Sequence, residues 1–210
     1  MEDFVLPFLV RKPAKTPDHP KVLILLHGVG SNEEDLFRFA DRFPDYIVLS
    51  PRGRYILSLG RYAWYQVGFS TGKPVINEEQ ERRSRELLLQ FVRQARQEYR
   101  PEEIFLGGFS QGAIMSYSIG LTHPEEIDGI LALSGRILAE IKPFVKKSER
   151  LQRLRVFIAH GLHDTTLPVS YAREAREYLL REGITPGYHE YNTGHQIDER
   201  LLTDLVDWLP

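Results

Sequence analysis

The chain has 210 residues, of which 42% are hydrophobic and 27% charged, as is typical of one globular domain that buries its own core. It contains no cysteine, which excludes disulfides, thiolate metal sites and a cysteine nucleophile. Lys and Arg number 27 against 29 Asp and Glu, so the net charge of −2 lacks the basic excess of a typical nucleic-acid-binding protein.

The start of the chain and its apolar runs bear on its location. Met1-Glu2-Asp3 is acidic, whereas a secretory signal begins basic and continues into an apolar stretch. The aliphatic run from Val22 to Leu26 is far shorter than the roughly 20 residues that a membrane helix needs. We therefore expect a single domain over residues 1–210 in the cytoplasm, with no nucleic-acid partner and no stable membrane insertion. The oligomeric state stays open, a homodimer included.

Short apolar runs alternate with amphipathic stretches along the chain. Continuous aliphatic runs predict strands buried on both faces, and apolar residues at helical spacing predict helices. In chain order, the pattern predicts an edge strand over 4–10, a strand over 21–27, a helix over 33–43, a strand over 46–50, a helix from 77, a strand over 104–107, a helix over 111–121, strands over 129–133 and 155–159, a helix over 171–181, a strand over 187–191 and a helix over 197–208.

Residues 51–75 break this pattern, with four glycines, two prolines and five aromatic residues. A loop this long is uncommon in a compact domain and usually serves a function. We expect its residues 54–69 to shape an apolar pocket together with residues 136–144. Arginines in such loops are more often solvent-exposed surface residues. Alternatively, Arg52, Arg54 and Arg61 could attract an anionic leaving group.

Asn77 suits the start of the following helix, because it is a good N-cap and Gln80 stands at the capping-box position. Three i,i+4 pairs are predicted along this helix: Glu78/Arg82, Glu79/Arg83 and Glu81/Arg85.

Repeated strand–helix units predict an α/β fold, with a mainly parallel central sheet and helices on both faces. In such sheets, sites form in the loops beyond the carboxyl ends of the strands. Candidate catalytic residues are therefore sought directly after predicted strands.

Residues 108–112 read Gly-Phe-Ser-Gln-Gly and match G-x-S-x-G between a strand and a helix. This context is the one in which a sharp turn exposes a nucleophilic serine, here Ser110. Taken alone, the motif also fits a glycine-rich turn with a helix-capping serine.

A serine hydroxyl needs a base to take its proton, and the base needs an acid to orient it. His195 follows the last predicted strand in Thr193-Gly194-His195, and Asp164 follows the strand 155–159. The chain order Ser110, Asp164, His195 is that of α/β-hydrolases. Alone, Asp164 also fits a loop acid or a helix cap, but the three together predict a catalytic triad.

Negative charge that develops on the substrate carbonyl needs hydrogen-bond donors. We expect the backbone N–H of Gln111, the residue after the nucleophile, and that of Val29 in the loop after the first buried strand. His27 precedes this loop, and we interpret it as a structural rather than a catalytic histidine. His160, His163 and Asp164 could be a metal cluster, but their spacing on a predicted loop does not favour one.

At this point the sequence resembles the phospholipase/carboxylesterase family of α/β-hydrolases, in its acyl-protein thioesterase-like, bacterial predicted-esterase branch. The matching pieces run from about residue 21 to 196: 25–33 (LLHGVGSNE), 50–53 (SPRG), 64–65 (WY), 108–112 (GFSQG), 133–135 (LSG), 160–161 (HG) with Asp164, and 194–195 (GH).

The resemblance implies a small, lidless serine esterase without a cofactor or metal. It carries over Ser110 as nucleophile, His195 as base, Asp164 as its orienter and the backbone N–H groups of Val29 and Gln111 as oxyanion donors. It also places Trp64 near the substrate mouth, and we expect Tyr65 and Leu167 at the substrate as well. Gln66 stands where thioesterase members tend to carry an acid, and residues 31–33 read Ser-Asn-Glu where they tend to have Asp-Thr-Gly.

The sequence thus predicts a carboxylesterase for short to medium acyl chains, working through an acyl-enzyme on a small-molecule ester. Alternatives are an acyl-protein thioesterase or lysophospholipase, an acyltransferase on the same fold, and a non-catalytic binding module. A binding module has no need of an intact triad, so the predicted triad argues against that alternative.

Overall fold

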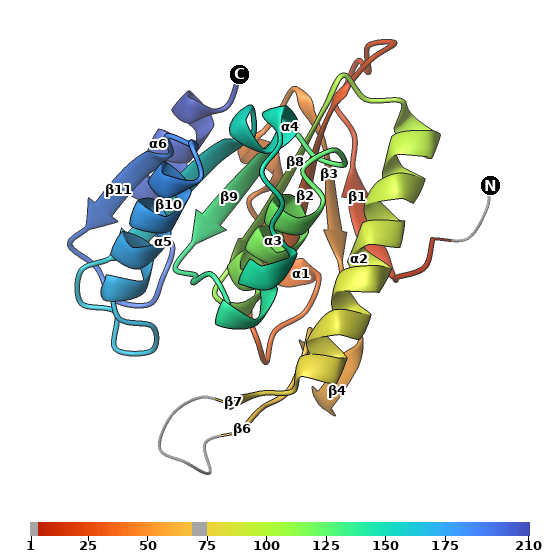
Figure 1. The fold of residues 1–210 in the computed structure, drawn as a ribbon. Helices are drawn as coiled ribbons and strands as arrows, with labels where there is room; N and C mark the ends of the chain where they lie inside the picture. The colour runs from red at the N-terminus through yellow and green to blue at the C-terminus, as the bar shows by residue number, and fades with distance from the viewer. Residues whose placement is uncertain (1–3, 69–74) are drawn as a thin grey trace.

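The computed structural model describes residues 4–68 and 75–210. Its centre is a seven-stranded sheet in the order β1-β3-β2-β8-β9-β10-β11 (Figure 1). The first strand is antiparallel to its neighbour, and all other neighbours in this sheet are parallel. The strands are β1 (Phe8–Arg11), β2 (Lys21–Leu26), β3 (Tyr46–Pro51), β8 (Glu103–Phe109), β9 (Gly129–Leu133), β10 (Arg155–Gly161) and β11 (Gly187–Tyr191).

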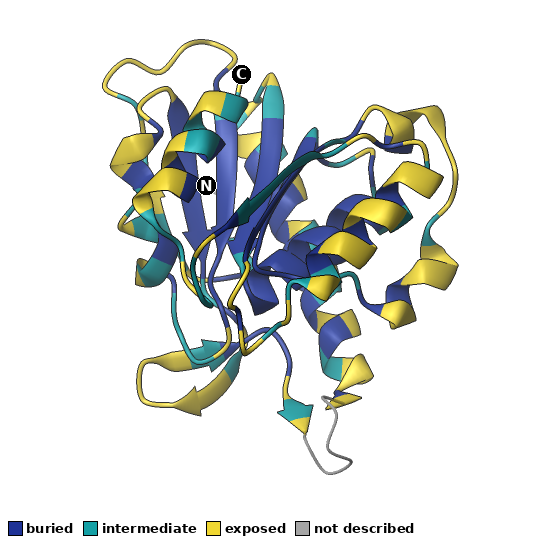
Figure 2. Cartoon of the chain, turned by 90° about the vertical axis from the view of Figure 1, so that its left-hand side faces the viewer, coloured by how far each residue is buried: buried dark blue, intermediate teal, exposed yellow. Residues whose placement is uncertain are grey.

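Helices cover both faces of the sheet, because buried strands alternate their side chains between two apolar clusters. Along β2, Val22 and Ile24 belong to one cluster, and Leu23 and Leu25 to the other. The first cluster takes in α2 (Glu78–Tyr99), α3 (Gln111–Thr122) and α5 (Ser170–Arg181). The second takes in α1 (Glu34–Phe37), η1 (Ala40–Arg42) and α6 (Glu199–Trp208). Figure 2 shows the buried strands between helices whose outer faces are exposed. The predicted parallel α/β fold is confirmed.

The helix predicted over 33–43 is wrong as a single element. The backbone leaves helical geometry at Phe39 (φ −94°, ψ 0°), which separates α1 from the short 3-10 turn η1. Leu36, Ala40 and Phe43 are all buried in the second cluster. Two short turns therefore satisfy the apolar spacing that predicts one continuous helix.

The long loop predicted over 51–75 contains two small antiparallel hairpins, β4 (Tyr55–Ser58) with β5 (Arg61–Ala63), and β6 (Val67–Gly68) with β7 (Val75–Ile76). In Figure 1, β4, β6 and β7 lie at the lower end of the sheet, toward which β9 and β11 point. Phe69, which was expected in the pocket-shaping segment, lies outside the described residues. Two further short elements were not predicted: η2 (Ala139–Phe144) and α4 (Glu149–Gln152).

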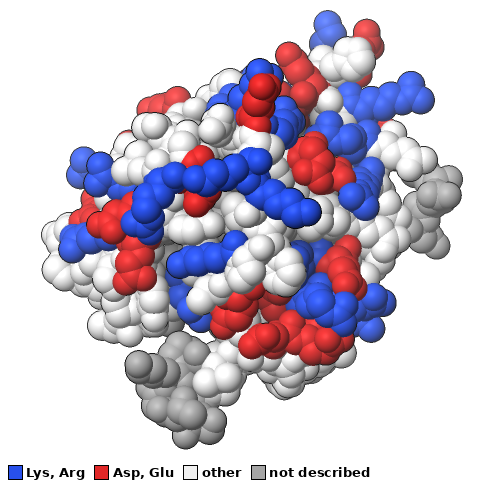
Figure 3. Space-filling model, in the orientation of Figure 1, with Lys and Arg blue, Asp and Glu red and all other residues white. Residues whose placement is uncertain are grey.

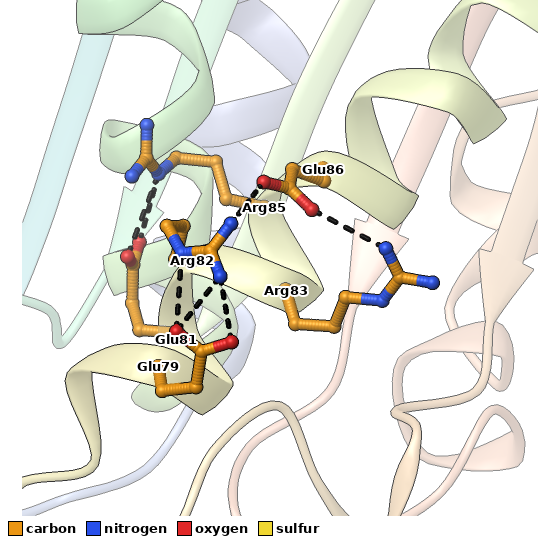
Figure 4. Close-up of polar contacts among 6 residues, drawn as sticks. All are labelled: Glu79, Glu81, Arg82, Arg83, Arg85 and Glu86. Atoms are coloured by element: carbon orange, nitrogen blue, oxygen red, sulfur yellow. Dashed lines mark hydrogen bonds and ion pairs between the residues drawn. The ribbon is translucent and has the colours of Figure 1, made fainter.

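Helix α2 begins as expected, since the Asn77 side chain accepts the Gln80 N–H at 3.0 Å. The reciprocal half of a capping box does not form, because Gln80 Oε1 accepts the N–H of Gln66 instead. Of the three predicted ion pairs, Glu81–Arg85 forms (Figure 4). Arg82 contacts Glu79 and Glu86 rather than Glu78, and Arg83 also contacts Glu86.

Positive and negative side chains are interspersed on the face shown in Figure 3. Within residues 4–68 and 75–210, no helix combines the length and the apolar character needed to cross a membrane.

Candidate active site

Ser110 lies at the junction of β8 and α3, where the chain turns from strand into helix. Its φ of 55° and ψ of −116° are unusual for a residue with a side chain. The Ser110 N–H donates to the carbonyl oxygen of Leu133 on the neighbouring strand at 2.9 Å, which anchors the turn. This strained strand–turn–helix geometry is the one that G-x-S-x-G predicts.

The turn needs glycine on both sides because backbone passes at close range. A Cβ on Gly112 would lie 2.0 Å from the carbonyl oxygen of Leu26, at the end of β2. A Cβ on Gly108 would lie 2.4 Å from the carbonyl carbon of Gly112. The first turn of α3 is thereby held against the end of β2, where the predicted oxyanion loop begins.

Asp164 and His195 meet beyond the ends of β10 and β11. His195 Nδ1–H donates to Asp164 Oδ2 at 2.6 Å, and Asp164 is 6% exposed. The other carboxylate oxygen, Oδ1, accepts the N–H groups of Thr166 at 2.9 Å and Leu167 at 2.8 Å. These two backbone bonds orient the carboxylate toward the imidazole.

His160 is a second imidazole beside the same carboxylate, and it was considered from the sequence only as a member of a disfavoured metal cluster. Its Nε2–H donates to the Leu167 carbonyl oxygen at 2.7 Å and lies 3.3 Å from Asp164 Oδ2. Burial lowers the pKa of His160, so its neutral form is favoured. His163, in contrast, contacts the Asn192 side chain. Among the described residues, no cluster of potential metal ligands occurs.

His195 stands beside the nucleophile's own turn. Its imidazole is 4.7 Å, between ring centroids, from the ring of Phe109, the residue before Ser110. Between these two described residues, Ser110 and His195, the structure shows no hydrogen bond. In free enzymes this bond is often long and tightens when substrate binds.

The predicted oxyanion loop also lies at the nucleophile. A Cβ on Gly28 would be 3.4 Å from Ser110 Cβ, so Gly28 lies beside the serine. Val29 lines the same cavity as Ser110 and Gln111. Gln111 opens α3, where backbone N–H groups have no partner within the helix. Among the described residues, no acceptor faces the N–H of Val29.

His27 is buried and holds this loop in place through two hydrogen bonds. Its Nδ1–H donates to the Gly28 carbonyl oxygen at 2.8 Å, and its Nε2 accepts the Gly53 N–H at 2.9 Å. Burial lowers the pKa of His27, consistent with a neutral imidazole that both donates and accepts. These contacts agree with its interpretation as a structural histidine.

Gln111 ties the hairpin segment to the nucleophile through its side chain, a link that the sequence did not reveal. Its Oε1 accepts the Trp64 N–H at 2.8 Å, and its Nε2 donates to the Tyr65 carbonyl oxygen at 2.7 Å. Ser84 of α2 also bonds the Trp64 carbonyl oxygen. The Trp64–Tyr65 segment is therefore fixed between α2 and α3.

A cavity of about 880 Å³ opens at Ser110. Tyr65 and Leu167 line it, as expected. Trp64 does not belong to this lining: its ring is 1% exposed, lies 5.2 Å from the His27 ring and donates through Nε1 to the His27 carbonyl oxygen. The indole thus contacts the start of the predicted oxyanion loop, and a role for Trp64 near the substrate mouth stays a prediction.

Of the three arginines considered for binding an anionic leaving group, two contact other groups of the protein and one is exposed. Arg52 pairs with Glu33, donating to it through both Nε and Nη2. Arg61 donates to the Gly30 carbonyl oxygen at 3.0 Å, and Arg54 is exposed. Among the described residues, the charged side chain that lines the cavity is instead that of Arg136, which directly follows Ser134 and Gly135 after β9. The sequence signal that could have identified Arg136 was its position shortly after a predicted strand.

The family model for Phospholipase/Carboxylesterase matches residues 9–210. The chain belongs to this family. The family resemblance and the α/β-hydrolase fold predicted from the sequence are confirmed. The chain is thereby a member of a family of carboxylesterase-type serine hydrolases.

Curated relatives in the family include Acyl-protein thioesterase 1 of Emericella nidulans, 31% identical over 52% of this chain and 48% of that protein. A probable carboxylesterase of Arabidopsis thaliana is 28% identical over 52% of this chain and 42% of that protein. The matches thus span about half the length of these curated relatives.

Solved structures extend the likeness to almost the whole chain. The Bacillus cereus carboxylesterase is 25% identical, with a TM-score of 0.81, over 97% of this chain and 92% of that one. A Mesorhizobium loti carboxylesterase reaches a TM-score of 0.84 at 20% identity, over 99% and 96% of the two chains. At that identity, the second match shows the shared fold alone.

Proposed function

We propose that the chain is a carboxylesterase that cleaves esters of short to medium acyl chains through an acyl-enzyme on Ser110. The observation that carries this proposal is the hydrogen bond between the buried Asp164 and the half-buried His195, near a strained serine that lines a cavity. A cavity of about 880 Å³ falls within the usual size of small-molecule sites.

In the acylation step, His195 takes the proton from Ser110 Oγ as that oxygen attacks the ester carbonyl carbon. The N–H groups of Val29 and Gln111 then stabilise the oxyanion of the tetrahedral intermediate. The intermediate collapses, the alkoxide leaves with the proton held by His195, and the acyl group stays on the serine.

In the deacylation step, His195 takes a proton from water, and the resulting attack releases the acid and restores Ser110 Oγ–H. Asp164 orients the imidazole and stabilises the imidazolium that forms on it. The Thr166 and Leu167 N–H groups, which bond its Oδ1, hold the carboxylate in place for this role.

A second candidate is a thioesterase or lysophospholipase acting through the same residues. It is favoured by the curated relatives that are named acyl-protein thioesterases. The same three residues can cleave an oxygen ester or a thioester. The preferred acyl group and leaving group therefore distinguish the two candidate functions.

The test is hydrolysis of p-nitrophenyl esters from acetyl to palmitoyl by wild type, Ser110→Ala and Ser118→Ala. Wild type should be most active on short to medium chains, and Ser110→Ala should lose activity by about 10⁶ in kcat, as another serine triad does. Ser118→Ala is the matched control, because it removes a buried hydroxyl of α3 that has no hydrogen-bond partner among the described residues.

A maximum at long chains, with faster cleavage of acyl thioesters or lysophospholipids, would favour the second candidate. Retained activity in Ser110→Ala, or no activity in wild type at any chain length, would contradict the proposal.

A further inference from the structure

The cavity at Ser110 has an almost uncharged wall. The side chains that line it are apolar or neutral, with one exception among the described residues, which is Arg136. Its guanidinium lies 5.5 Å from the centroid of the Tyr171 ring, and Tyr171 lines the same cavity. The described part of the cavity wall therefore presents one positive charge on a largely apolar surface.

The fold holds this charge close to the nucleophile. Ser110 N–H bonds the Leu133 carbonyl oxygen, and Arg136 follows Leu133 by three residues, at most about 11 Å of extended chain. Gly135 is packed tightly, since a Cβ there would lie 2.5 Å from Ala113 Cβ. The backbone that carries Arg136 is thus fixed against the first turn of α3, which Ser110 caps.

Arg136 differs in its partners from those arginines of the chain that form ion pairs. Arg52 pairs with Glu33, Arg85 with Glu81 and Arg173 with Glu190. For Arg136, no carboxylate partner occurs among residues 4–68 and 75–210, and the side chain is half-buried. Removing a cation from water is costly unless an anion compensates it. Arginine also matches the planar geometry of carboxylate and phosphate oxygens.

We propose that Arg136 is a specificity-determining residue that binds an anionic oxygen group, a carboxylate or a phosphate, carried by the ester substrate. This inference rests on the proposed esterase function and deepens it. The preferred substrates would then be esters with one negative charge a few bonds from the scissile carbonyl, seated against Arg136 while Ser110 attacks.

Two matched pairs of esters test this subsite and distinguish where the anion lies. The acyl-side pair is p-nitrophenyl hemiadipate and its neutral carboxamide analogue, p-nitrophenyl adipamate. The alcohol-side pair is 4-acetoxybutyl phosphate and neutral 4-acetoxybutanol. For each pair, the ratio of anionic to neutral kcat/KM is measured after subtracting the rate without enzyme.

Wild type should prefer the anionic member of at least one pair tenfold or more. Arg136→Gln should bring that ratio to one or below, and Arg136→Lys should keep part of it because the charge remains. Arg54→Gln is the matched control, since Arg54 is exposed and does not line the cavity, and it should keep the wild-type ratio. Wild type should also lose part of the preference at high salt, a readout that needs no variant.

Turnover of the neutral esters without any anionic preference, or a preference that persists in Arg136→Gln, would overturn this subsite and leave the esterase proposal standing. No turnover of any of the four esters by wild type would instead count against the esterase function, and with it against the subsite.

Discussion

Hydrogen bonds hold the carboxylate of Asp164 in the orientation that the proposed reaction requires. Two backbone N–H groups hold one carboxylate oxygen, and His195 occupies the other at 2.6 Å. Sequence order alone predicted this pairing, because both residues follow strands that end at the same edge of a parallel sheet. The adjacent His160 could not be assigned in the same way, because its bond to Leu167 depends on how the loop after β10 folds back.

The buried histidines make stability depend on pH. Burial lowers the pKa of His27 below its ordinary value of 6.5, and that of His160 likewise. Between the lowered pKa and 6.5, the unfolded chain binds more protons than the folded chain. The free energy of unfolding therefore keeps its full value above pH 6.5. It decreases as the pH drops below 6.5, by up to about 1.4 kcal/mol per pH unit for each histidine.

His27→Gln tests this at one position, because the amide can still accept the Gly53 N–H. The variant should be less stable than wild type at pH 7.5, yet lose less stability between pH 6.5 and 5.5. Urea unfolding across this range measures the slope. Curves that run parallel for the two proteins would show that His27 does not carry the effect.

At the scale of elements, the contact between α3 and β2 positions the site. Gly112 allows it, because a Cβ there would lie 2.0 Å from the Leu26 carbonyl oxygen and 2.8 Å from that of His27. Both atoms are backbone, so no side chain can rotate away. Any residue larger than glycine must push the first turn of α3 off the sheet.

Gly112→Ala should therefore cost about 2 kcal/mol or more of stability and displace the nucleophile, as overpacking at buried sites does. Gly68→Ala is the control: among the described residues, the nearest atom to its Cβ would be 4.0 Å away, and the stability of this variant should stay within about 0.5 kcal/mol of wild type. Chemical denaturation of both variants measures the difference. A Gly112→Ala protein as stable as wild type would refute this account of the contact.

Long periodic elements were predictable, and short ones were not. The strands β9 and β11 match their predicted bounds, because each is an isolated run between turns. The hairpins after β3 have strands of two to four residues, too short for an alternation of side chains to appear. The same shortness hid η2 and α4.

At the scale of the whole molecule, the candidate site lies where a parallel sheet gathers its strand ends. Ser110, Asp164 and the proposed oxyanion loop follow β8, β10 and β2, and the small hairpins lie at the same end in Figure 1. This architecture made the meeting of Asp164 with His195 predictable from order and spacing. It did not reveal which side chains face the cavity, because Trp64 and Arg136 take their places from packing between segments distant in sequence.

The most direct test of the central claim is the site at which a fluorophosphonate labels the native protein. The reagent reacts with a serine whose proton a base removes, as proposed for Ser110 with His195. Peptide mass spectrometry should find one adduct, on Ser110, and Asp164→Asn should slow its formation by about 10⁴ if its effect follows that known for the corresponding change in another serine triad. An adduct on another residue, or ester hydrolysis that continues after Ser110 has been fully labelled, would contradict the account.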